Sequence, residues 1–222
     1  MGPNSPNKQI DILHSAYPTP ISTIRIIKKK CPDTTILSQV PLYLARYHHP
    51  SIGRPTVFGF TLRINALPLD GDSLVAMGLA CAPYPTFRLP GWHRGSLAVH
   101  SDDGHRYCND GFGGIEFTEP FSQGDIYTLG LIMIVVADGT PRGMVESEVR
   151  FFRNGQRVGS WQVREELEEG RMDPKVGFLG ERDVFAALGV TGAKGVEVQF
   201  QALSYEDAWR VVYEREPPTF KN

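Results

Sequence analysis

The stretch VFGFTLRINALPLDGDSLVAMGLA, residues 57–80, carries the strongest secondary-structure signal in the chain. Residues 57–64 alternate apolar and polar side chains, which is the period of a half-buried β-strand. Residues 73–80 are small, apolar and continuous, as expected of a fully buried strand. The segment PLDGD between them has Asp70-Gly71 at its centre and favours a turn. The stretch therefore predicts two strands with a turn between them.

Similar strand-like runs occur on both sides of this stretch. They lie at residues 21–27, 95–100, 105–108, 126–136, 148–152, 156–161, 183–189 and 196–202. Asn154-Gly155 separates two of these runs and is a strong hairpin signal. Short strands at close spacing, joined by turns rich in glycine and proline, are typical of an antiparallel sandwich or barrel. We therefore predict an all-β protein.

Two segments have a helical pattern, residues 163–169 and residues 204–213. The second begins with Ser204 and Asp207, three residues apart, as in a capping box. Its apolar side chains at helical spacing are Tyr205, Ala208, Trp209 and Val212. We expect a short C-terminal helix that packs one face against the domain.

The composition limits the class of protein. The chain has 222 residues, 23 Lys and Arg against 25 Asp and Glu, and a net charge of −2. This balance argues against a nucleic-acid-binding protein, which usually carries a basic patch. A chain of this length can bury a core without a disulfide or a metal. The three cysteines, Cys31, Cys81 and Cys108, are an odd and widely spaced set that fits reduced thiols in the cytoplasm, with access to the nucleus left open.

Neither a membrane span nor an export signal is predicted. The longest apolar run, residues 126–136, has about half of the ~20 residues that a spanning helix needs. The N-terminal residues lack the apolar region of a secretory signal.

Composition shifts suggest boundaries along the chain. We predict a disordered tail at 1–9, an N-terminal extension packing on the sandwich at 10–56, the main domain at 57–202, and a helix with a tail at 203–222. Prolines recur between residues 18 and 55, so this part is expected to be irregular apart from the strand at 21–27. Residues 137–147 and 165–182 resemble insertions into strand connections.

The motif Arg88–Trp92 (RLPGW), followed by Ser96, His100–His105 (HSDDGH) and Cys108, resembles the SPRY domain of the Ran-binding-protein-M group. The resemblance continues in register through Phe121–Asp125, Phe151–Gly155 and Asp183–Gly189, so that it covers about residues 57–202. Pro83-Tyr84-Pro85 is also similar to the SPRY domain of fungal endosomal ubiquitin-ligase adaptors. The helical self-association modules of the Ran-binding-protein-M proteins have no counterpart after residue 202, where only one short helix is expected.

The resemblance implies a bent, concanavalin A-like sandwich of two antiparallel sheets that binds short peptides or protein surfaces through loops at one edge. It implies no catalysis, no cofactor and no metal, and it suggests recruitment of a substrate or adaptor to a ubiquitin ligase. The residues that it places at the partner-binding edge are Arg88, Leu89, Tyr107, Asn109, Asp110, Val190 and Thr191. Among them, Arg88 and Tyr107 are expected to be the anchors because Arg and Tyr dominate interface hot spots.

Several residues allow other interpretations. The set His100, Asp102, Asp103 and His105 could hold a metal, but Asp-Asp-Gly is also typical of a turn, and we favour the turn. Cys108 and His105 could form a nucleophile–base pair, but on one strand an offset of three places them on opposite faces. Trp92 is either a core residue beneath the Pro-Gly turn or an exposed aromatic anchor, and we favour the core.

Two other classes of function stay open. A carbohydrate- or small-ligand-binding β-sandwich is the first alternative, because lectins use exposed aromatics with Asp and Asn loops. An enzyme that uses the region of His100 and Asp102 is the second, and it would need a titrating pair in a cleft.

Overall fold

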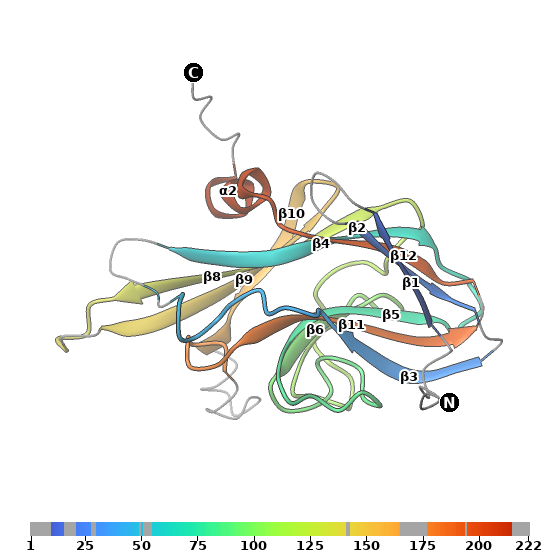
Figure 1. Ribbon diagram of the computed structural model, residues 1–222, viewed down its shortest axis with the longest axis horizontal. Helices are drawn as coiled ribbons and strands as arrows, with labels where there is room; N and C mark the ends of the chain where they lie inside the picture. The colour runs from blue at the N-terminus through green and yellow to red at the C-terminus, as the bar shows by residue number, and fades with distance from the viewer. Residues whose placement is uncertain are drawn as a thin grey trace, which may run out of the picture.

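The computed structural model describes residues 10–15, 21–27, 30–48, 50, 55–140, 143–164, 177–193 and 195–214. These residues form two antiparallel sheets that stack face to face, with helix α2 (Tyr205–Tyr213) on the outside of one sheet (Figure 1). The prediction of an all-β sandwich with a short C-terminal helix is therefore confirmed.

The two sheets contain seven and five strands in the described residues. The larger one has the order β1 (Ile10–Ser15), β2 (Ile21–Ile26), β12 (Glu197–Ala202), β4 (Thr56–Ala66), β8 (Ile126–Val136), β9 (Met144–Arg153) and β10 (Gln156–Gln162). The smaller one has the order β3 (Lys30–Leu37), β11 (Val184–Ala193), β5 (Leu74–Cys81), β6 (Ser96–His100) and β7 (Arg106–Cys108). Neighbours in each sheet pair antiparallel.

The core lies between the sheets. Every residue of β5 is buried, as its continuous apolar sequence predicts. Its inward side chains, Met77 and Leu79 among them, share one apolar cluster with residues of the opposite sheet. Aromatic rings fill one part of that cluster, where Phe121 and Tyr127 stack with their centroids 4.0 Å apart. The burial of apolar surface in this core is the main favourable contribution to the folding of the sandwich.

The two predicted turns, at Asp70-Gly71 and Asn154-Gly155, are both present, but only the second closes a hairpin. Asp70-Gly71 does not close a hairpin, because β4 and β5 belong to different sheets. The Asp70 carboxylate accepts hydrogen bonds from the amides of Asp72 and Ser73, at 3.0 and 2.8 Å, and holds the crossover between the sheets. Asn154-Gly155 closes the β9–β10 hairpin, with φ of 52° and 79°. Positive φ at both positions is what a tight two-residue hairpin requires.

The N-terminal part is more regular than expected. β2 confirms the predicted strand at 21–27, but β1 and β3 were not predicted. β3 contains Pro32, which has no amide hydrogen to donate, and a sheet tolerates it because β3 is an edge strand. The register between β3 and β11 also shifts between Val190 and Gly192, opposite this part of β3. This segment therefore adds strands to both sheets instead of crossing the surface as irregular chain.

The two expected insertions are smaller or only partly described. β9 begins at Met144, so the connection after β8 covers residues 137–143 and not 137–147. Residues 165–176, and with them most of the helix expected at 163–169, lie outside the described residues. Phe178, which follows, is fully buried in the core, and its carbonyl accepts a hydrogen bond from Ser147 Oγ at 2.6 Å.

Helix α2 begins at the predicted capping box. Ser204 Oγ accepts a hydrogen bond from the Asp207 amide at 3.1 Å, and the Asp207 carboxylate accepts one from the Ser204 amide at 3.2 Å. This reciprocal pair satisfies amides that the first helical turn leaves unpaired. The side chains of Tyr205 and Trp209 lie outside what the structure describes, so the predicted apolar face is tested only at Ala208 and Val212, both half-buried.

The helix is fixed to the larger sheet through Val211. Its side chain is buried directly over Gly130 of β8, where a Cβ would lie 2.5 Å from Val211 Cγ1. Arg150 of β9 donates hydrogen bonds to the carbonyls of Val211 and Val212 at 2.9 and 2.8 Å. A guanidinium at the C-terminal end of a helix also stabilises its dipole. Within the described part of the chain, no helix has the length and apolar character to cross a bilayer.

Candidate interaction site

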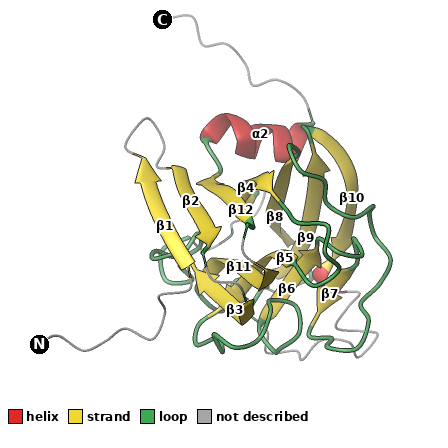
Figure 2. Ribbon diagram, turned by 90° about the vertical axis from the view of Figure 1, so that its right-hand side faces the viewer, coloured by secondary structure: helices red, strands yellow, loops and turns green. Residues whose placement is uncertain are grey.

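The outer face of the five-stranded sheet is lined with small residues. Ala76, Gly78 and Ala80 alternate along β5, and they pair with Gly189 and Ala187 of β11 and with Ala98 of β6. Residues 82–95, which connect β5 to β6, cover this face, on the side of the sandwich opposite α2 (Figure 2). Small side chains let the covering chain approach the sheet closely.

The Leu-Pro-Gly motif makes the closest of these approaches. A Cβ at Gly189 would lie 2.5 Å from Pro90 Cδ and 3.0 Å from Leu89 Cδ2. A Cβ at Gly91 would lie 2.5 Å from Tyr107 Cβ, and Gly91 has a φ of 91°. Both glycines are therefore required where they stand, one by contact and the other by contact and backbone conformation.

Buried hydrogen bonds hold the covering segment in place. Ser96 Oγ accepts from the Gly91 amide at 2.8 Å and donates to the His93 carbonyl at 2.7 Å. Tyr84 Oη, which is also buried, donates to the Leu89 carbonyl at 2.7 Å. These bonds explain why a serine follows the RLPGW motif at a fixed distance. A segment fixed in this way presents its exposed residues on a rigid support.

His100 lies beneath this segment and is fully buried. Its Nε2 lies 2.9 Å from the Pro90 carbonyl, which can only accept, so Nε2 carries the proton. The ring stacks on Tyr107 at 4.1 Å between centroids and lies 5.5 Å from the Trp92 ring. His100 Nδ1 has no hydrogen-bond partner within the described part of the chain. His100 thus acts as a packed core residue that also binds the covering segment.

Burial makes His100 a source of pH-dependent stability. Burial lowers the pKa of His100, and this effect outweighs the Pro90 hydrogen bond and the nearby carboxylates of Asp102, Asp103 and Asp33, which act in the other direction. The folded state therefore holds a neutral imidazole, while the unfolded chain protonates near its ordinary pKa of about 6.5. The stability that the neutral His100 imidazole contributes is therefore fully present above about pH 6.5, and it is lost as the pH falls below this value.

We expect the free energy of unfolding to fall between about pH 6.5 and pH 5 in the wild type, and to fall less steeply in His100→Gln. The amide of glutamine can still donate to a carbonyl but does not titrate. Urea unfolding at a series of pH values measures both slopes. Equal slopes in the two proteins would show that His100 does not carry this dependence.

The polar cluster after β6 is a turn, as predicted. Asp103 Oδ1 accepts from the His105 amide at 2.8 Å, and Gly104 has a φ of 71°. Asp103 Oδ2 accepts from Tyr107 Oη. Among the described residues, no group of three His, Cys, Asp or Glu side chains is arranged to hold a metal ion. Cys108 is buried in the core between the sheets, whereas His105 lies in the loop, with Nδ1 2.7 Å from the Gly113 carbonyl.

The seven residues predicted to bind a partner do not all reach the surface. Arg88 is exposed, and Asn109, Asp110 and Thr191 are half-buried. The buried members of the set are Leu89, Tyr107 and Val190. Leu89 packs on the small residues of the sheet, and Val190 belongs to the core between the sheets. These three side chains support the surface and do not form it.

Tyr107 therefore cannot be the exposed anchor that we expected. Its ring is 6% exposed and is held between His100 and the backbone of Gly91 and Gly114. Burial raises the pKa of Tyr107, and the hydrogen bond to Asp103 raises it further. Trp92 is neither a fully buried core residue nor a fully exposed anchor. It packs on the cluster of Leu74, Ala76 and Leu89 and is half-buried.

Comparison with known proteins agrees with this geometry. No family model matches the chain. Protein ssh4 of Sclerotinia sclerotiorum is 32% identical over 126 residues, which cover 57% of this chain and 21% of that protein. A SPRY domain-containing protein of Schizosaccharomyces pombe is 31% identical over 145 residues, 65% of this chain and 33% of that protein. A human SPRY domain superposes with a TM-score of 0.52 and 22% identity, covering 81% of this chain and 90% of that domain.

This chain contains a SPRY domain. The matched part spans between a fifth and a third of the length of these curated relatives, so it corresponds to one domain within a longer protein in each of them. The human SPRY domain has the same fold. In the present chain the RLPGW motif has a structural role. Arg88–Trp92 is the cover of the five-stranded sheet, and Ser96 and His100 are the residues that hold it.

Two exposed aromatic residues of the SPRY domain were not predicted. Phe87, next to Arg88, is 71% exposed, and Phe112, which follows the loop after β7, is fully exposed. The loop of Phe112 adjoins the covering segment, because the Asp110 amide donates to the Gly91 carbonyl at 2.9 Å. The sequence pattern does not separate Phe87 from Tyr84 and Trp92 of the same loop, whereas Phe112 is an aromatic residue among polar residues and glycines at 109–114.

Phe87 borders a groove at the edge of the predicted site. The groove has a volume of about 690 Å³ and lies where the start of β3 meets the end of β11. Its lining includes Asp33, Asp72, Lys30 and Thr191 in addition to Phe87. Thr191, a residue of the predicted set, thus lies in a concave surface that carries both charge and an exposed aromatic ring.

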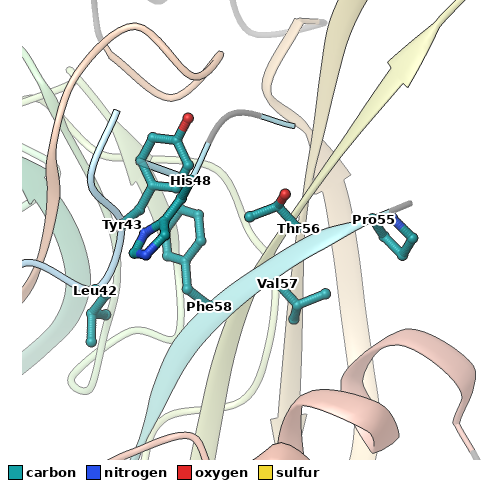
Figure 3. A pocket seen from close by; sticks show the side chains of 7 residues that line it. All are labelled: Leu42, Tyr43, His48, Pro55, Thr56, Val57 and Phe58. Carbon is teal, nitrogen blue, oxygen red and sulfur yellow. The ribbon is translucent and has the colours of Figure 1, made fainter. Parts of the chain in front are cut away.

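A second pocket lies at the other end of β11, and two of its polar side-chain atoms are already hydrogen-bonded. It has a volume of about 380 Å³, and Figure 3 shows the rings of Tyr43, His48 and Phe58 gathered on one side of it. Tyr43 Oη donates to the Gly180 carbonyl at 3.1 Å, and the Leu44 amide donates to His48 Nδ1 at 3.0 Å. Burial raises the pKa of Tyr43.

Proposed function

We propose that this SPRY domain is a non-catalytic interaction module that binds a short segment of a partner protein. The segment would lie across residues 83–92, 101–113 and 190–195. The observation that carries the proposal is the exposed ring of Phe87 on a covering segment that buried hydrogen bonds hold rigid. A rigid support for exposed loops is the usual arrangement of a binding surface.

The surface residues are of the types that bind proteins. Of the predicted set, Arg88, Asn109, Asp110 and Thr191 are accessible, and Phe87 and Phe112 join them. Aromatic residues and arginine supply most hot-spot energy at interfaces. Loops that are already ordered lose less conformational entropy on binding than flexible ones.

The cellular setting that we propose is recruitment of a substrate or adaptor to a ubiquitin ligase. It rests on the resemblance to the Ran-binding-protein-M group and to fungal endosomal ubiquitin-ligase adaptors. Ligase subunits among the captured proteins would support this setting, and their absence from a specific capture would leave the docking surface but remove the setting.

Affinity capture with matched variants tests the proposal. Phe87→Ala is expected to reduce capture of the specific partner at least about tenfold, because an exposed hot-spot aromatic contributes about 2 kcal/mol. Tyr47→Ala is the control, since Tyr47 is also 71% exposed but lies in the segment that pairs with the start of β11, at the opposite end from Thr191. Mass spectrometry of the captured proteins gives the readout.

Neither substitution removes a buried group, so both variants are expected to melt close to the wild-type temperature. Equal capture by the wild type and Phe87→Ala, or an equal loss in Tyr47→Ala, would contradict the proposal. A melting shift on adding sugars, without specific protein capture, would favour a carbohydrate-binding domain in its place.

A further inference from the structure

Two of the described residues that line the groove beside Phe87 are carboxylates without an ion-pair partner. Asp33 and Asp72 line it, and Asp102 lies in the turn after β6. Within the part of the chain that the structure describes, none of these three aspartates forms a salt bridge. Asp102 is exposed and lies two residues after His100, the last residue of β6.

Cys31 and Pro32 also line the groove, and an apolar cluster adjoins it. Thr191 in the groove pairs with Leu74 across β11 and β5, and Leu74 packs against Leu89 and the half-buried Trp92. Phe87 forms one side of the groove with most of its ring exposed. The surface therefore offers apolar contact and negative charge within one short distance.

The excess of negative charge is local to the described lining of the groove. Two further aspartates, Asp103 and Asp110, accept hydrogen bonds from neutral donors in the adjoining loops. The cations on the same segments are Lys30, Arg88, Arg94, Arg106 and Lys194. Asp103 is also 3.5 Å from His105 Nδ1. Carboxylates and cations are thus balanced over these segments, but among the described residues that line the groove itself there are two carboxylates and one lysine.

We propose that the partner segment bound here is cationic, with an arginine or lysine side chain that enters the groove between Asp33 and Asp72. The inference rests on the proposed docking function and adds the chemistry of the ligand. The aliphatic part of the cationic side chain packs on Phe87, whose ring face attracts a positive group. Arginine fits better than lysine because its planar guanidinium both stacks and forms paired hydrogen bonds with carboxylates.

Panning of a phage library of random peptides on the full chain tests this inference. We expect the selected sequences to be enriched in arginine and lysine next to an apolar residue. A synthetic copy of a selected peptide is expected to bind Asp33→Asn and Asp72→Asn at least about tenfold more weakly than the wild type, with most of the wild-type affinity lost on raising the ionic strength from about 0.05 M to about 0.5 M.

Asp138→Asn is the matched control, because Asp138 lies in the distant turn after β8 and asparagine keeps an acceptor for Thr140. It is expected to leave peptide affinity unchanged. A selection of basic peptides that ignores Asp33→Asn and Asp72→Asn would overturn the inference. So would a selection of neutral or acidic peptides, but if these lose affinity in Phe87→Ala, the docking function would stand. A library that yields no peptide dependent on Phe87 would overturn the proposed function as well.

Discussion

Gly189→Val is expected to destabilise the protein by about 3 kcal/mol, the upper part of the range for forcing extra methyl groups into a packed site. A Cβ at this position would already lie 2.5 Å from Pro90 Cδ and 2.9 Å from Ala76 Cβ. The covering segment must therefore lift from the sheet or the strands must shift. For a chain of this size the melting temperature falls by about 10 °C.

Gly113→Val is the control for this change. Gly113 lies in the exposed loop after β7 and has no heavy atom within 4 Å of the position of a Cβ. Thermal unfolding of the two variants beside the wild type measures the difference. A melting temperature for Gly189→Val within about two degrees of the Gly113→Val value would mean that the RLPGW segment does not pack on the sheet as described.

Tyr107→Ala is expected to cost about 4 kcal/mol, as for other buried aromatic residues cut back to alanine. The substitution removes the ring that stacks on His100 and that fills the space beside Gly91 and Gly114. It also removes the donor to Asp103. The loss should appear in equilibrium unfolding by urea, in the absence of any partner.

Tyr107→Phe separates the two contributions of this side chain. Phenylalanine keeps the stack and loses only the hydrogen bond, so the cost should be about 1 kcal/mol. If Tyr107→Ala kept wild-type stability and lost partner binding, Tyr107 would be a surface anchor, and the buried position described here would be wrong.

The strands that the sequence predicted are those whose pattern is local. β5 is a continuous apolar run, and Asn154-Gly155 specifies its own hairpin. β1 and β3 were not predicted because their stability comes from pairing with other strands and not from their own sequence pattern. β1 pairs with β2 along six residues, and β3 contains Pro32 at a sheet edge, where the shifted register with β11 allows it. Such pairing depends on distant residues, which periodicity in one segment cannot show.

The sequence indicated a candidate region for the site but not which of its residues are exposed. Periodicity does not indicate which side of a loop faces the sheet, and the burial of Leu89 and Tyr107 depends on Gly189 and His100, far away in the sequence. Phe87 is exposed and Leu89, two residues later, is buried, although both are large apolar residues of one loop. The resemblance indicated which loops to consider, and the packing shows which of their residues are buried and which are exposed.

Hydrogen–deuterium exchange of the full chain, alone and with a peptide selected by panning, tests the docking surface most directly. The account predicts that bound peptide slows exchange in residues 83–92, 109–113 and 190–193, and leaves residues 42–48 and 204–214 unchanged. Slower exchange confined to residues 42–48, or along α2, would contradict it and place the binding surface elsewhere on the sandwich.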